Sequence, residues 1–157
     1  MASINGSSGN DTLVGGVGSD TFSGLGGIDV FSVAAGGSAL TIAGAGTAGT
    51  IAGFDIVTDF GAGPTAALSE KLQFAGADLV GNTGSSHGAT STLRLHTGSS
   101  VTAHTVNGGI IQFDDAADNK FAAAVELTSM SDVAAVVQYL QGTGFGGGKS
   151  VAFSATI

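Results

Sequence analysis

The chain has 157 residues, of which 28 are glycine, none is cysteine and 43% are hydrophobic, so a buried core is possible but a disulfide framework is not. Twelve acidic residues face four basic ones for a net charge of −8, which excludes nucleic acid as a partner because phosphates could not be neutralised. No apolar run approaches about 18 residues, so membrane insertion is not expected.

The first predicted element is a nine-residue repeat at residues 6–32, which reads GSSGNDTLV, GGVGSDTFS and GLGGIDVFS. Glycine recurs at the first and fourth positions, aspartate at the sixth (Asp11, Asp20 and Asp29), and a large apolar residue at the eighth. Such glycines favour a tight turn with positive φ. The last three residues of each unit favour a short strand whose middle side chain points inward. A glycine-rich hairpin with solvated aspartates would explain neither the period nor the apolar eighth position.

The repeat resembles the calcium-binding nonapeptide of the RTX (repeat-in-toxin) proteins, G-G-x-G-x-D-x-U-x. This resemblance implies a short right-handed parallel β-roll in which two nonapeptides form one turn. It also implies Ca²⁺ between loops stacked on the same edge, and carbonyls with carboxylates are the hard oxygen ligands that Ca²⁺ prefers. A first site would then use Ser7, Gly9, Asp11, Gly24, Gly26 and Asp29.

The opposite edge of the implied roll would carry a second, weaker site. Its first half would be Gly16, Gly18 and Asp20. The partner loop carries Ser38 where the repeat would have aspartate, so one charge is missing. Fewer charged ligands lower the affinity of a calcium site.

After Ser32 the repeat decays, and residues 33–41 and 42–50 keep the length of nine without aspartate, which predicts degenerate later turns. Residues 53–76 resemble the segment that closes many RTX rolls, with Asp55 and Asp59 among the matching positions. Both are candidate late ligands, and the alternative that they are strand-flanking turn residues stays open. We therefore expect the roll over residues 4–60.

The sequence of residues 61–157 predicts a β-rich, sandwich-like half with one or two short helices. We therefore expect the fold as a whole to be mostly all-β. Alternating residues favour strands over 91–98 and 101–115, with a hairpin turn at 107–109. A helix is expected near 131–141, with Ser131 as its N-cap and Gly142 as its stop. Residues 151–157 predict a final strand, and residues 142–150 a loop.

Catalysis finds no support in this sequence, and the protein is not expected to be an enzyme. His87, His96 and His104 lack the spacing of zinc ligands. The stretch GTGFGGGKS at 142–150 lacks the first glycine of a phosphate-binding loop and precedes a predicted strand. No nucleophile stands beside a recognisable base.

The resemblance implies a non-catalytic calcium-binding module that serves as the C-terminal folding and secretion tail of a bacterial extracellular protein. Such a tail is exported by the type I secretion machinery, so the expected location is secreted or at the cell surface. A calcium-dependent surface-layer or adhesin module, or the tail of a secreted hydrolase, remain alternatives. Because residues 151–157 stop in strand-like sequence, strand pairing with a second copy or with a missing C-terminal peptide is also expected.

Overall fold

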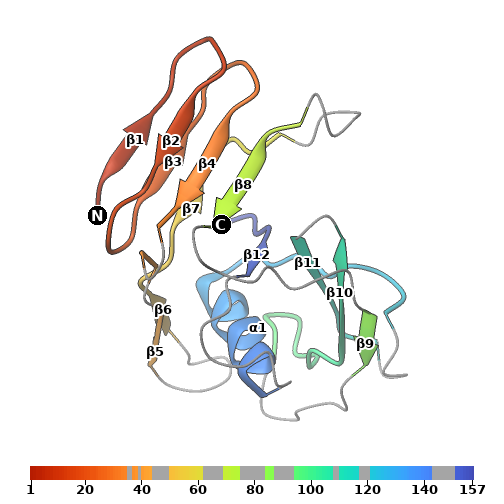
Figure 1. The fold of residues 1–157 in the computed structure, drawn as a ribbon. Coiled ribbons are helices and arrows are strands. Elements are labelled where there is room, and N and C mark those ends of the chain that lie inside the picture. The colour runs from red at the N-terminus through yellow and green to blue at the C-terminus, as the bar shows by residue number, and fades with distance from the viewer. Residues whose placement is uncertain are drawn as a thin grey trace. The chain divides into compact units, whose positions relative to one another are not determined.

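The computed structural model describes residues 1–34, 37–38, 40–43, 50–61, 69–74, 84–86, 94–107, 110–116, 121–142 and 151–157. The chain divides into two compact units. The first unit contains Met1–Thr41 and Ala52–Ala77, and the second contains Ile42–Ile51 and Asp78–Ile157. Figure 1 shows the elements of both.

The first unit consists of two parallel three-stranded sheets (Figure 1). One has the order β1 (Ser3–Asn5), β3 (Thr21–Ser23) and β7 (Ile56–Val57); the other has β2 (Thr12–Val14), β4 (Val30–Val33) and β8 (Lys71–Phe74). Successive strands β1 to β4 therefore alternate between the two sheets. This is the arrangement expected of a parallel β-roll. Strand β8 lies beyond the boundary expected at residue 60 and pairs with β4.

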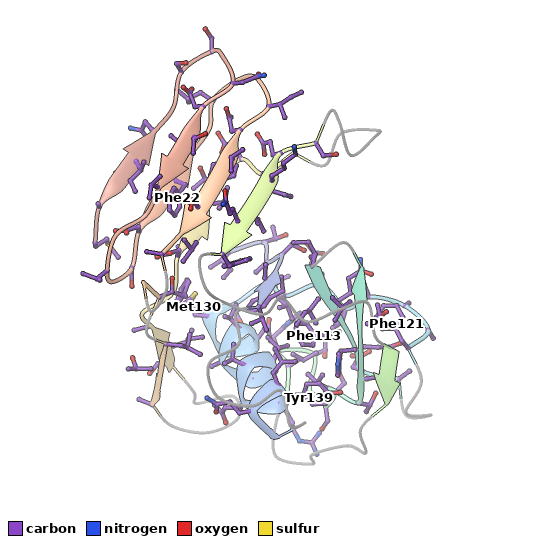
Figure 2. All side chains as sticks on the ribbon, viewed as in Figure 1. Phe22, Phe113, Phe121, Met130 and Tyr139 are labelled. Carbon is purple, nitrogen blue, oxygen red and sulfur yellow. The ribbon has the colours of Figure 1, made fainter. Side chains whose placement is uncertain are left out.

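The core of the roll is built from the apolar eighth positions of the repeat. Leu13, Phe22 and Phe31 are buried, and the two rings meet edge to face with centroids 6.0 Å apart. In Figure 2, Phe22 lies among the strands of the roll. Full burial of each such side chain stabilises the fold by about 1.5–3 kcal/mol, so the periodic apolar residue is sufficient reason for the strands to stack in register.

After Val33, none of the described residues up to 50 forms a further strand of the roll, although the length of the two degenerate repeats predicts two more turns. The strands β5 (Thr41–Ala43) and β6 (Thr50–Ala52) pair with each other and join neither sheet of the roll. The next strand beside β3 is β7, which places Phe22 opposite Val57. The physical reason lies at the eighth position of the two degenerate nonapeptides, 33–41 and 42–50. The first has Leu40 there, which is exposed, and the second has Gly49, which has no side chain to bury. We call residues 34–54, which separate β4 from Asp55, the excursion; of these the structure describes residues 34, 37–38, 40–43 and 50–54.

The second unit contains a four-stranded sheet of order β12-β11-β10-β9. Its strands are β9 (Gly84–Ser86), β10 (Ala103–Asn107), β11 (Ile110–Asp114) and β12 (Ala152–Phe153). Strands β10 and β11 run antiparallel with Asn107 opposite Ile110, as the predicted hairpin requires, although residues 108–109 lie outside the described residues. The described part of this unit contains one such sheet, so the expected sandwich is not confirmed.

Helix α1 spans Met130–Gly142, close to the predicted 131–141, and is the one helix in the described part of the chain. Its predicted apolar face is buried, and Tyr139 meets Phe113 of β11 edge to face (Figure 2). The predicted cap was wrong by two residues: the Ser129 hydroxyl, rather than that of Ser131, accepts the N–H of Asp132 at 3.1 Å. None of the described helical sequence is long and apolar enough to cross a membrane.

One predicted strand is absent from the described residues, and another is shorter in the structure than in the sequence pattern. In place of a strand over 91–98, the chain turns after Leu95, whose carbonyl accepts the N–H of Gly98; residues 91–93 lie outside the described residues. Gly98 has φ of +83°, a conformation that breaks a strand. The final strand is limited to β12, after which the N–H of Thr156 donates to the Leu127 carbonyl. Of the loop predicted at 142–150, Gly142 is the last residue of α1 and residues 143–150 lie outside the described residues.

Candidate metal centre

The loops that follow β1 and β3 stack on one another at one edge of the roll. The N–H of Gly6 donates to the Ser23 carbonyl at 2.8 Å, and the N–H of Gly26 donates to the Ser7 carbonyl at 3.0 Å. The side chain of Asn10 adds a bond from the N–H of Ile28 at 2.8 Å. This stacking brings the first and third repeats together, as the 18-residue period predicts.

The sixth-position aspartates form a ladder along the roll. Asp29 Oδ1 accepts the N–H of Asp11 at 2.9 Å, and Asp20 Oδ1 accepts the N–H of Ala2 at 2.8 Å. Ala2 occupies the sixth position of the turn before the first repeat. Each of these carboxylates therefore ties its own turn to the turn before it on the same edge.

One oxygen of Asp29 is left without a partner by this ladder. The residue is 0% exposed, and its Oδ2 is buried with no hydrogen-bond donor in the described part of the structure. An ionised carboxylate in that position carries a large desolvation penalty unless a cation or a donor meets it. A buried, unpartnered carboxylate oxygen beside Gly24 fits a hard divalent cation such as Ca²⁺.

The glycines of the repeat serve two different purposes. At the fourth position, Gly18 and Gly27 have φ of +96° and +111°, as expected for turn glycines. At the first position the requirement is space instead: a Cβ on Gly24 would lie 2.1 Å from Asp29 Oδ2. A side chain there would push the carboxylate away from the stacked loops.

The opposite edge of the roll carries the second predicted half-site. Asp20 Oδ2 accepts the N–H of Gly16 at 2.9 Å, and the N–H of Gly18 donates to the Gly37 carbonyl at 2.6 Å. The loop with Ser38 therefore lies where the period predicts, and the Ser38 hydroxyl is buried without a partner in the described part of the chain. The strand beside Asp20 is nevertheless β7, and Asp55 Oδ1 accepts the N–H of Asp20 at 2.8 Å.

Asp59 has a different environment from the other predicted ligands. Its carboxylate accepts the N–H groups of Gly24 and Leu25, both at 2.9 Å, and the hydroxyl of Ser23 at 2.8 Å. Desolvation opposes its ionisation, but these hydrogen bonds outweigh it and hold the pKa of Asp59 below its ordinary value. Leu25 has φ of +70°, so the carboxylate holds a strained backbone at the end of the loop stack.

Residues 3–31 match the family model of the RTX calcium-binding nonapeptide repeat (4 copies). These residues are RTX repeats. Repeats of this family bind calcium, are generally non-catalytic and occur in secreted proteins. No curated protein and no solved structure matches the chain.

The described residues contain no group of three or more His, Cys, Asp or Glu side chains that could hold a metal ion. A cation bound within residues 3–31, the RTX segment, would therefore need backbone carbonyls as ligands in addition to two carboxylates. Each of the two described histidines has a side-chain neighbour: His96 Nδ1 lies 2.8 Å from Asp132 Oδ2, and His104 Nδ1 lies 3.0 Å from the Tyr139 hydroxyl. His87 lies outside the described residues.

Two buried carboxylates of the second unit were not singled out as important from the sequence. Asp132 accepts the N–H groups of His96 and Thr128, and Asp114 accepts those of Ala116, Ala122 and Ala123. Burial opposes ionisation of both, but the hydrogen bonds outweigh it and lower the pKa of Asp114 and of Asp132. The only sequence signal was the position of Asp132 in the first turn of a predicted helix. Both carboxylates organise loops rather than an RTX calcium site.

Proposed function

We propose that the RTX segment binds Ca²⁺ between the loops at residues 6–9 and 24–27. The carboxylates of Asp11 and Asp29 would be ligands together with the carbonyls of Ser7, Gly9, Gly24 and Gly26. The observation that carries this assignment is the fully buried Oδ2 of Asp29, which has no donor in the described part of the chain. When bound, calcium supplies the positive charge that this oxygen lacks.

On the opposite edge, Gly16, Gly18 and Asp20 supply the first half of a second calcium position. Asp59 serves this module as the cap of the loop at 23–25, because its carboxylate accepts two backbone N–H groups and the hydroxyl of Ser23 from that one loop. The cap supplies the hydrogen-bond acceptors that a further turn would otherwise provide.

The module acts as the folding and secretion tail of a type I-secreted extracellular bacterial protein and performs no catalysis. The support is energetic: with a Kd of about 0.1 mM and about 1 mM external Ca²⁺, each site adds roughly 1.4 kcal/mol. That is a large share of the stability of a small domain. In calcium-poor cytoplasm the acidic repeats repel one another and the segment stays competent for export.

Calcium titration of the 157-residue chain tests this function. Calorimetry should show heat of binding at submillimolar to millimolar Ca²⁺, and circular dichroism should show strand signal gained relative to a chelated sample. Magnesium at the same concentration is the control for ionic strength. Absence of binding heat at millimolar Ca²⁺, together with superimposable spectra, would rule the function out.

A second candidate function is calcium-dependent assembly through strand pairing with a second copy of the chain. The observation in its favour is that β12 is the outermost strand of its described sheet, beside β11. Light scattering with and without calcium separates the two functions. Oligomers that form only with Ca²⁺ favour assembly, and a monomer at all calcium concentrations favours the secretion tail.

A further inference from the structure

The excursion at residues 34–54 interrupts the roll without interrupting its register. Within the repeats the chain advances 18 residues from one sixth-position aspartate to the aspartate stacked upon it, Asp11 to Asp29. From Asp20 the corresponding step is 35 residues and ends at Asp55. The strand that follows resumes the roll, because the N–H of Ile56 donates to the Asp20 carbonyl at 2.9 Å, as the N–H of Val30 does to the Asp11 carbonyl.

Asp55 is bonded in the same way as Asp29. In each residue Oδ1 accepts the N–H of the aspartate one turn earlier, at 2.8 Å for Asp55 and 2.9 Å for Asp29. In each residue Oδ2 is buried with no partner in the described part of the chain. An equivalent pattern of one satisfied and one unsatisfied oxygen indicates an equivalent role, although Asp55 lies beyond the matched repeats at residues 3–31.

The two ends of the excursion meet the same edge of the roll. The departing end is tied through the Gly37 carbonyl to the N–H of Gly18, and the returning end through Asp55 to the N–H of Asp20. The buried, unpartnered oxygens of Ser38 and Asp55 belong to these two ends. A cation held beside Asp20 would therefore be bound by both the loop that leaves the roll and the strand that returns to it.

We propose that Asp55 completes the calcium position of the second edge, and that the ion fastens both ends of the excursion to the roll. This proposal rests on the calcium binding proposed above and changes what is expected of the second site. Asp20 gains a carboxylate partner from outside the repeats, so this position is not weakened by the serine at residue 38. Attachment of the Gly37 loop and of Asp55 to the roll becomes dependent on calcium.

Calorimetry with CaCl₂ tests the proposal on the full chain and on Asp55→Asn, which keeps the oxygen that accepts the N–H of Asp20 and removes the charge. Asp29→Asn is the matched variant for the first site, and Glu126→Gln removes one charge from an exposed residue of the second unit as a control. Asp55→Asn should lose one binding event or weaken it by more than about tenfold. Glu126→Gln should leave both events in place.

Amide hydrogen exchange on the unmodified chain gives a readout that needs no variant. Calcium should slow exchange at Asp20, Ile56 and Thr58, whose N–H groups bond across β3 and the returning strand. Calcium binding without that protection, or an Asp55→Asn chain with unchanged stoichiometry and affinity, would overturn this proposal and leave the first site intact. An unmodified chain that binds no calcium would remove the proposed function as well.

Discussion

Asp29 lies 18 residues from Asp11 along the chain, and its carboxylate accepts the backbone N–H of Asp11 at 2.9 Å while its other oxygen remains buried without a partner in the described part of the structure. One side chain therefore both joins two turns of the roll and offers the oxygen that a cation would bind. Neutralising that oxygen relieves the desolvation penalty of the same group that holds the turns together. Calcium binding and roll formation are coupled through this contact.

Calcium should raise the thermal stability of the first unit. With two sites of about 1.4 kcal/mol each, saturation at millimolar Ca²⁺ should raise the midpoint of its transition by roughly 10–20 °C. Differential scanning calorimetry across a calcium series measures the shift. In Asp29→Asn the shift should fall to about half, and a shift as large as that of the unmodified chain would show that Asp29 is not a ligand.

Gly27→Ala should destabilise the roll by about 2 kcal/mol or more. Gly27 has φ of +111°, and a Cβ there would lie 2.6 Å from the carbonyl carbon and oxygen of Gly9. Gly9→Ala is the control, because the nearest atom to its Cβ would be Ser7 Oγ at 3.8 Å. Urea unfolding of both variants gives the comparison, and equal stabilities would contradict the described stacking of these loops.

Phe22→Ala should remove most of the stability of the first unit, at about 3–5 kcal/mol. Phe22 is 0% exposed and contacts the ring of Phe31 from the opposing sheet. Val17→Ala is the surface control, since Val17 is 85% exposed and its loss should change stability by less than about 0.5 kcal/mol. Chelated and calcium-loaded samples should rank the variants in the same order by circular dichroism.

The second unit should lose stability as the pH falls into the acid range. Hydrogen bonds from His96 and Thr128 keep the pKa of Asp132 below its ordinary value of 3.8 despite burial. A folded-state pKa below the unfolded value means that ionisation stabilises the fold, fully so above the unfolded pKa and progressively less as the pH drops through the folded one.

Thermal melts of chelated protein between about pH 6 and pH 3 measure this loss. Asp132→Asn removes the titrating group, so its stability should be lower near neutral pH and should depend less steeply on acid. A variant with the same acid dependence as the unmodified chain would indicate that Asp132 is not responsible. Asp114, whose pKa is also lowered, remains ionisable in the variant and sets the residual dependence.

The nine-residue period predicted the strands β2 to β4, the core of Leu13, Phe22 and Phe31, and the pairing of Asp11 with Asp29. These features repeat along the sequence, so one turn determines the next. The 35-residue step from Asp20 to Asp55 could not be predicted from the sequence. It depends on the pairing of β7 with β3, and no local sequence pattern specifies that pairing.

The N-cap of α1 is a second feature that the local sequence could not predict. Ser129 and Ser131 are both good N-cap residues by their chemistry. The first of them is used while the carboxylate of Asp132 accepts the N–H of His96, 36 residues away along the chain. The choice of cap therefore coincides with a contact between distant segments. The N-cap preferences of residues 129–132 alone do not predict such a contact.

The alternation of strands between the two sheets has a kinetic consequence. None of β1 to β4 bonds to the strand that follows it in the chain, so the earliest pairing, β1 with β3, requires a loop from Asn5 to Thr21 to close. Loop-closure entropy is lost before any strand pairing or ring contact compensates for it. We expect nucleation to be the slow step, and a growing or emerging chain to remain without roll structure until the third strand is free to pair. The hydrophobic contact of Phe22 with Phe31 comes later still, because it needs the fourth strand.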